Sequence, residues 1–124
     1  MEELEKAREA KKELKKIKNE FEGRDYLIQL ENQELTALCP FTTNPDFYEI
    51  KISYQPNKEL IELKSLKLYL QKFRDIRITH ESLLNIIFED IDSLISPKYL
   101  KVELNVNIRG GIKTVVIREK GSIK

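Results

Sequence analysis

The chain has 124 residues, enough for one domain and too few to build two comfortably. Hydrophobic residues make up 40% of it and charged residues 35%, a mixture that can bury a core and argues against a disordered chain. A formal net charge of +1 gives no general basis for binding nucleic acid or a membrane, so we expect neither as a direct partner.

The numbers of cysteine and histidine residues limit which cellular compartment and which kind of metal site the sequence fits. The single Cys39 cannot form an internal disulfide, and with the single His80 it leaves too few ligands for a structural zinc site, so we predict no metal. The sequence has no signal-type apolar segment at its start and no run long enough to cross a bilayer. We therefore expect a cytoplasmic protein.

The first 22 residues are dense in Glu and Lys and carry an apolar residue at every third or fourth position. This spacing predicts an amphipathic helix over residues 1–22, with Gly23 as its stop and residues 24–124 as the main domain. The predicted apolar stripe consists of Leu4, Ala7, Ala10, Leu14, Ile17 and Phe21. Such a stripe needs a partner surface in its own domain or on a neighbouring subunit; a solvated, frayed helix is the alternative.

Alternating apolar and polar residues then predict two strands joined by a short loop. Residues 26–38 favour an extended chain up to Cys39 and Pro40, where proline ends the pairing, and residues 48–54 alternate as a half-buried strand. Cys39 and Asp46 therefore lie at the two ends of one loop. A turn at this place can bring a thiol and a carboxylate into one pocket.

A helix is predicted from about residue 64 to residue 74, after a turn at Pro56. Lys64 and Lys67 are three residues apart, so they share a face of this helix and could present paired positive charge to an anionic ligand such as a phosphate. In the alternative interpretation, the helix is simply amphipathic, and its lysines are solvated while Leu66 and Leu70 point inward.

A second helix is predicted over residues 80–95, with Thr79 as its N-cap, which puts His80 and Glu81 in the first turn. The chain ends as a hairpin: residues 100–108 alternate cleanly, Arg109, Gly110 and Gly111 turn, and residues 112–118 return. The sequence thus predicts an α+β domain, with an antiparallel four-stranded sheet, two helices on one face and the extra N-terminal helix. Open sheet edges invite closure through further copies of the chain.

Residues 62–69, Glu-Leu-Lys-Ser-Leu-Lys-Leu-Tyr, match every position of the signature of the QueF-type nitrile reductases. The Cys-Pro step at residue 39, the Pro-Asp-Phe step around residue 46, the His-Glu pair at residue 80 and the Arg-Gly-Gly turn match this family too. The resemblance spans roughly residues 24–112, without the N-terminal helix, and is to the short, single-domain form. It implies the tunnelling fold, in which subunits join their sheets into a ring-shaped barrel with active sites at subunit interfaces.

The reaction implied by this resemblance is the reduction of 7-cyano-7-deazaguanine to 7-aminomethyl-7-deazaguanine with two NADPH, in the biosynthesis of the queuosine modification of tRNA. Cys39 would add to the nitrile as the nucleophile and form a covalent thioimide. Asp46 would be the general acid/base, because a carboxylate beside a thiol disfavours the thiolate and is better suited to moving protons.

The resemblance also assigns residues to the two ligands. A carboxylate accepts both N–H groups of a guanine-like edge at once, which makes Glu62 and Glu81 the candidates for substrate binding. The remaining substrate residues are the backbone of Ile61 and Leu63, and His80, which ranks below Glu81. The candidates for NADPH binding are Leu63, Lys64, Lys67, Arg109 and Gly110.

Other interpretations of the same residues stay open at this stage. Cys39 alone could be a small buried hydrophobe, Glu81 a carboxylate that favours the helix dipole, and the Arg-Gly-Gly step an ordinary hairpin turn. The nearest rival function is a related amidinotransferase, which acts on a deazaguanine nitrile already in tRNA and takes no hydride. A non-catalytic, purine-binding ring protein is the rival from another class.

Overall fold

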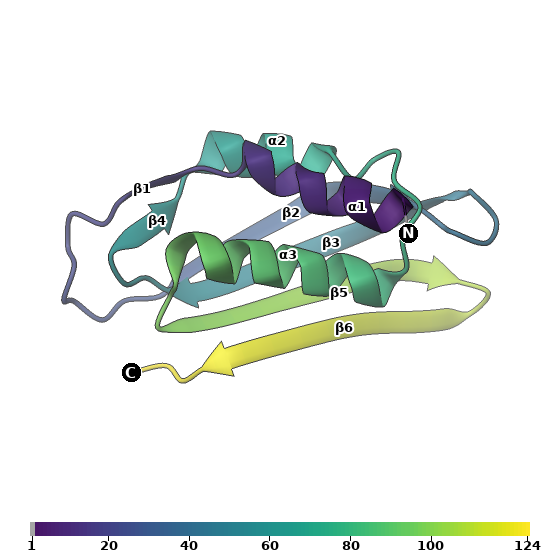
Figure 1. Cartoon of the computed structure of the whole chain (residues 1–124). Helices are drawn as coiled ribbons and strands as arrows, with labels where there is room; N and C mark the ends of the chain where they lie inside the picture. Colours follow the sequence, from purple (N-terminus) through teal and green to yellow (C-terminus); the bar gives the residue numbers. More distant parts are fainter. Residues whose placement is uncertain (1) are drawn as a thin grey trace.

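The fold is described from a computed structural model, for residues 2–124. A four-stranded antiparallel sheet in the order β2-β3-β5-β6 forms one layer, and the helices form the second layer on one of its faces (Figure 1). The strands of this sheet are β2 (Ile28–Leu38), β3 (Pro45–Gln55), β5 (Tyr99–Arg109) and β6 (Ile112–Gly121). The helices are α1 (Glu2–Glu9), α2 (Leu63–Gln71) and α3 (His80–Ile95). The predicted α+β class and the order of its strands and helices are confirmed.

The core lies between the sheet and the helices. Every second residue of the two central strands is buried there, as the period of two in their sequences requires: Tyr48, Ile50, Ile52 and Tyr54 of β3, and Leu100, Val102, Leu104 and Val106 of β5. From α3, this core receives Leu83, Leu84, Ile87, Ile91 and Ile95. No helix among residues 2–124 is long and apolar enough to cross a membrane.

The prediction of one helix over residues 1–22 is wrong in its extent. Helix α1 ends at Glu9, a 3-10 turn follows over Ala10–Glu13, and the chain then becomes extended as β1 (Lys16–Lys18), which pairs with β4 (Glu59–Ile61) in a separate two-stranded sheet. The stripe therefore divides: Ala7, Ala10 and Leu14 are buried in the main core, whereas Ile17 and Phe21 are 49% and 58% exposed.

The physical reason for this difference is pairing with a distant segment. At the two ends of the two-stranded β1–β4 sheet, the Asn19 N–H donates to the Lys58 carbonyl and the Glu62 N–H donates to the Lys15 carbonyl, both at 2.9 Å. These bonds satisfy the backbone as a continued helix would, and tertiary pairing of this kind overrides a local helical pattern. The apolar stripe has its partner surface within the chain's own core.

Both remaining helices begin at capped positions. Helix α2 starts one residue earlier than predicted and ends three residues earlier, at Gln71, and the carboxylate of Glu62 accepts hydrogen bonds from the N–H groups of Lys64 and Ser65, each at 2.8 Å. Helix α3 has the predicted bounds, and its N-cap Thr79 accepts from the Ser82 N–H at 3.2 Å. The first residues of both helices are therefore fixed in place, which matters because predicted ligand-binding residues lie there.

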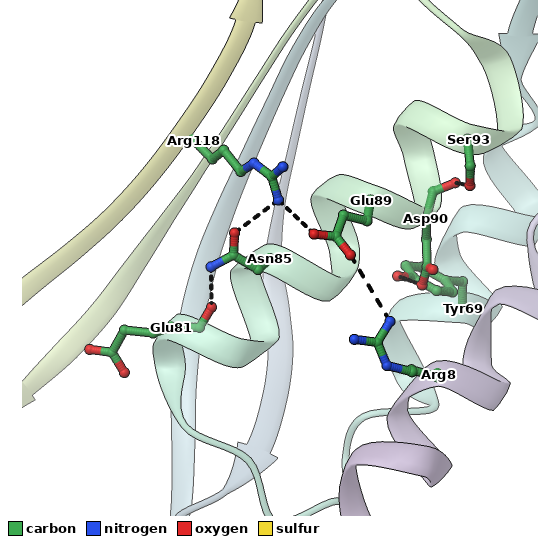
Figure 2. Close-up of polar contacts among 8 residues, drawn as sticks. All are labelled: Arg8, Tyr69, Glu81, Asn85, Glu89, Asp90, Ser93 and Arg118. Carbon is green, nitrogen blue, oxygen red and sulfur yellow. Dashed lines mark hydrogen bonds and ion pairs between the residues drawn. The ribbon is translucent and has the colours of Figure 1, made fainter.

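A buried polar pair joins α2 to α3. The Tyr69 hydroxyl, fully buried, donates to the Asp90 carboxylate at 2.6 Å, and Figure 2 shows the two side chains meeting between the helices. Burial raises the pKa of the Asp90 carboxyl, and the Tyr69 hydrogen bond opposes that rise. The Tyr69 hydroxyl therefore favours the ionised form of Asp90 against the effect of burial.

Tyr69→Phe is expected to lower the free energy of unfolding at neutral pH by about 1–3 kcal/mol, because it leaves a buried carboxylate without its donor. Loss of the donor raises the folded-state pKa of Asp90 further above the unfolded value. The deficit should therefore be small below about pH 4, the ordinary pKa of Asp, and grow as pH rises toward neutrality. Urea unfolding across this range measures it; a deficit independent of pH, or an equal pH dependence in an Asp90→Asn background, would contradict the assignment.

Candidate active site

Four predicted site residues meet at one small cavity of about 130 Å³. Its lining consists of Cys39, Pro40, Phe41, Asp46, Ile78, Thr79, His80 and Glu81. The predicted nucleophile, the predicted acid/base and the His-Glu pair thus come from three separate parts of the chain: the end of β2, the start of β3 and the first turn of α3. The prediction that a turn brings Cys39 and Asp46 together agrees with this cavity.

A short parallel bridge holds the start of α3 against the end of β2. The Leu38 N–H donates to the Ile76 carbonyl at 2.9 Å, and the Ile78 N–H donates to the Leu38 carbonyl at 3.0 Å. Because Leu38 precedes Cys39 and Ile78 comes two residues before His80, this bridge places the thiol beside the first turn of the helix. The three elements lie at the same end of the sheet in Figure 1.

The loop after Cys39 is a tight turn. The Thr43 N–H donates to the Cys39 carbonyl and the Cys39 N–H to the Asn44 carbonyl, both at 2.9 Å, and Thr43 adopts a positive φ of 64°. Pro40 takes the first position of this turn, where a backbone N–H would not be needed. The Cys39 side chain consequently has the place of an N-cap, facing the N–H groups of the two residues after Pro40.

This turn activates the thiol by hydrogen bonding. The pKa of Cys39 is lowered chiefly by the Thr42 side chain, and further by the backbone N–H groups of Thr42 and Phe41, while desolvation and the negative charge of Asp46 act in the opposite direction. Donors to sulfur favour the thiolate, which is the nucleophilic form. Sequence analysis missed Thr42; a hydroxyl three residues after the cysteine of a Cys-Pro step was the available signal.

Thr42→Val is expected to raise the pKa of the Cys39 thiol toward its ordinary value, because it removes the largest of the stabilising hydrogen bonds. At neutral pH a smaller fraction of the thiol would be ionised, so alkylation by iodoacetamide would slow, and its pH midpoint would move to higher pH. Thr43→Ala, which changes an exposed neighbour, is the matched control and should leave the midpoint in place. An unchanged midpoint in Thr42→Val would remove this role.

Asp46 is buried, with 3% of its surface exposed, and it has a single cationic partner in the described part of the chain. Arg109 Nη1 donates to Asp46 Oδ1 at 2.6 Å and to the Pro45 carbonyl at 2.9 Å. Arg109, which was predicted as a cofactor ligand, contacts the predicted acid/base and is half-exposed beside Gly110 of the hairpin turn. This charge-assisted hydrogen bond fixes the orientation of the buried carboxylate.

His80 and Glu81 present different groups to the cavity. One ring nitrogen of His80, Nδ1, lies 2.8 Å from the hydroxyl of Tyr48, a buried residue of β3 that sequence analysis did not single out. The Glu81 side chain is exposed, and its backbone carbonyl accepts from Asn85 Nδ2 at 2.8 Å. Asn85 is held in turn by Arg118 of β6, and in Figure 2 the Glu81 carboxylate points away from this network.

The predicted residues at the start of α2 do not reach this cavity. Leu63 and Lys67 line a separate cavity of about 290 Å³ together with Gln29–Asn32 of β2, Leu66 and Leu70. Cys39 lies seven residues after Asn32, the last residue of β2 in this lining. At about 3.3 Å per residue of strand, Cys39 is about 20 Å from Asn32. The end of β2, which Cys39 follows, and the start of α2 lie at opposite ends of the sheet in Figure 1.

The predicted ligand-binding residues around the start of α2 differ in burial and in hydrogen bonding. Ile61 is buried and its N–H donates to the Tyr54 hydroxyl at 3.1 Å, and Lys64 is exposed at the start of α2. Hydrogen bonds from the N–H groups of Lys64 and Ser65 lower the pKa of Glu62, so its carboxylate stays ionised. A single chain therefore holds two separate groups of predicted ligand-binding residues.

Comparison with known proteins gives consistent results. A model of the family described as QueF-like protein matches residues 45–124. The NADPH-dependent 7-cyano-7-deazaguanine reductase of Syntrophus aciditrophicus is 43% identical over 114 residues, covering 90% of this chain and 81% of that protein. Its namesake from Halorhodospira halophila is 42% identical over 111 residues, covering 90% and 94%. Among solved structures, an archaeosine synthase QueF-Like in its apo form superposes with a TM-score of 0.73 at 23% identity, over 82% of this chain and 99% of that one.

Proposed function

Because the chain belongs to the QueF-like family, we propose that it is an NADPH-dependent 7-cyano-7-deazaguanine reductase that acts in queuosine biosynthesis. The observation that carries the proposal is the cavity where an activated thiol, a buried carboxylate and a His-Glu pair meet. The reaction takes place in the cytoplasm, where the Cys39 thiol stays reduced.

The first chemical step is the addition of Cys39 to the nitrile carbon. The thiol proton passes to Asp46, the sulfur forms a bond to carbon, and Asp46 returns the proton to the nitrile nitrogen, which gives a covalent thioimide. Arg109 holds the Asp46 carboxylate in place for these transfers through its hydrogen bond to Oδ1. Glu81 has both carboxylate oxygens available for the two adjacent N–H groups of the deazaguanine edge.

NADPH supplies two hydrides when bound, which together reduce the nitrile to the primary amine. The residues that would hold its phosphates are Lys64 and Lys67, which are exposed on α2 and form no salt bridge within residues 2–124. Leu63 contributes the wall of the neighbouring cavity. Arg109 and Gly110 would provide a further contact from the hairpin turn.

A ring-shaped homo-oligomer would complete the site. The sheet has two unpaired edges, the outer sides of β2 and β6, and β6 and its hairpin carry the exposed apolar residues Ile108, Ile112, Val115 and Ile117. Joining β6 of one copy to β2 of the next satisfies these edges and buries the apolar surface. Neighbouring copies can then bring the Glu62 and Lys64 group to the Cys39 cavity, which a single tunnelling-fold chain does not do. Glu62 can cap α2 and bind substrate together, since each carboxylate oxygen has a second lone pair.

The decisive experiment follows nicotinamide absorbance while the purified protein acts on 7-cyano-7-deazaguanine. Consumption of two NADPH for each nitrile, with the aminomethyl product, is expected for the four-electron reduction. Covalent capture of the nitrile with no loss of NADPH would favour the amidinotransferase instead. A protein that neither binds nor converts the nitrile would refute the enzyme assignment.

A further inference from the structure

His80, the only histidine of the chain, lies between the Cys39 cavity and a buried tyrosine. Its Nδ1 is 2.8 Å from the Tyr48 hydroxyl, and the two rings meet edge to face, with centroids 5.5 Å apart and an interplanar angle of 76°. These contacts fix both the position and the tilt of the imidazole. Nε2, on the other side of the ring, is the nitrogen left for the cavity.

Tyr48 is a rigid support for this contact. It lies on the central strand β3, paired with Leu35 of β2 on one side and Val106 of β5 on the other, and only 2% of its surface is exposed. It also shares the buried face of β3 with Asp46, two residues before it. A buried side chain on a central strand of the sheet has little freedom to follow a moving imidazole.

The direction of this hydrogen bond follows from the burial of the tyrosine hydroxyl and from its single partner among the described residues. Burial, followed by the negative charges of Asp46, Cys39 and Glu81, raises the pKa of the Tyr48 hydroxyl far above its ordinary value, so the hydroxyl keeps its proton. A phenolic hydroxyl can donate or accept, but within residues 2–124 the Tyr48 hydroxyl has no hydrogen-bond partner other than His80. If it accepted from an Nδ1–H, its own buried hydrogen would be left without an acceptor, so the hydroxyl is the donor. When Nδ1 accepts, the ring proton of the neutral imidazole is on Nε2.

We propose that Tyr48 is a positioning residue, whose hydroxyl holds His80 in the tautomer that presents an Nε2–H donor to the Cys39 cavity. The donor would serve a hydrogen-bond acceptor on the heterocycle of the substrate, beside the carboxylate of Glu81, which is acceptor-only. Together the His-Glu pair offers one donor and two acceptors to a purine-like edge. This use of the donor rests on the proposed function, whereas the tautomer itself does not.

The single histidine makes the tautomer directly measurable. In protein labelled with nitrogen-15 at histidine, at a pH where the imidazole is neutral, the wild type should show a protonated Nε2 and an unprotonated Nδ1. Tyr48→Phe should shift the populations toward a mixture, while Tyr99→Phe, which removes a tyrosine hydrogen bond to Glu119, should leave them as in the wild type. A protonated Nδ1 in the wild type, or unchanged populations in Tyr48→Phe, would overturn the assignment.

Kinetics test whether the tautomer matters for turnover. Tyr48→Phe should lower kcat/KM for the nitrile by roughly tenfold, the value of one well-placed hydrogen bond, and Tyr99→Phe should not. An unchanged kcat/KM in Tyr48→Phe would overturn the positioning role. A wild type that shows the expected tautomer but reduces no nitrile would refute the proposed function and leave the Tyr48 contact supported.

Discussion

Cys39→Ala is expected to lower the rate of NADPH consumption with the nitrile by on the order of 10³-fold or more, because the covalent route is lost with the sulfur. The fold should persist, since Cys39 is a half-buried loop residue outside the hydrophobic core. Steady-state absorbance measures the rate, and circular dichroism confirms the fold. Residual activity within tenfold of the wild type would contradict the role of Cys39 as nucleophile.

Cys39→Ser provides the matched control for this result. Serine preserves the size of the side chain and can accept the same hydrogen bonds from Thr42 and Phe41, but its hydroxyl does not ionise near neutral pH. It should therefore be nearly as inactive as the alanine variant. Mass spectrometry of protein incubated with nitrile alone separates capture from reduction: the wild type should gain the mass of one nitrile, and both variants should not.

Asp46→Asn is expected to lower turnover by about 10²–10⁴-fold, the usual contribution of a positioned acid/base. The amide oxygen can still accept from Arg109, so the shape of the cavity is retained, but the group can neither take the thiol proton nor return it to nitrogen. Rapid mixing of enzyme with nitrile should show slow formation of the adduct, which places the defect in the first step.

A suitable control for Asp46→Asn is Asp92→Asn. Asp92 is a half-buried carboxylate that pairs with Lys120 at 2.9 Å, on α3 and β6, so this change also removes one ion pair. It should leave turnover unchanged. Equal losses in the two variants would mean that Asp46 acts through stability alone and would contradict its role in proton transfer.

The sequence patterns predicted the sheet and α3 well, for identifiable reasons. The strict alternation of residues 100–108 fits only a half-buried strand, and Thr79 provides a cap whose hydrogen bond the structure shows. The prediction for the N-terminal segment failed because residues 16–18 carry a helical pattern but pair with residues 59–61, which are far away in the sequence. Pairing between short, distant segments leaves no signal in either one.

The candidate site was likewise predicted only in part from the sequence. Cys39, Asp46, His80 and Glu81 were predictable as neighbours or as ends of elements, and the resemblance joined them into one site. Tyr48 looked like any inward residue of an alternating strand, because its hydroxyl finds His80 only through the folding of α3 onto the sheet. Composition and spacing carry the chemistry of a residue but not the direction of its side chain.

The parallel bridge at the end of β2 also limits how copies of this chain can assemble. The outward N–H and carbonyl of Leu38 are hydrogen-bonded to residues 76–78. An added strand can therefore pair with the open edge of β2 only over the residues that precede Leu38. The bridge therefore limits the length of β2 that a neighbouring strand could pair with. In the proposed ring, the contact that places the thiol beside α3 would also exclude every alignment between subunits in which an added strand pairs with Leu38.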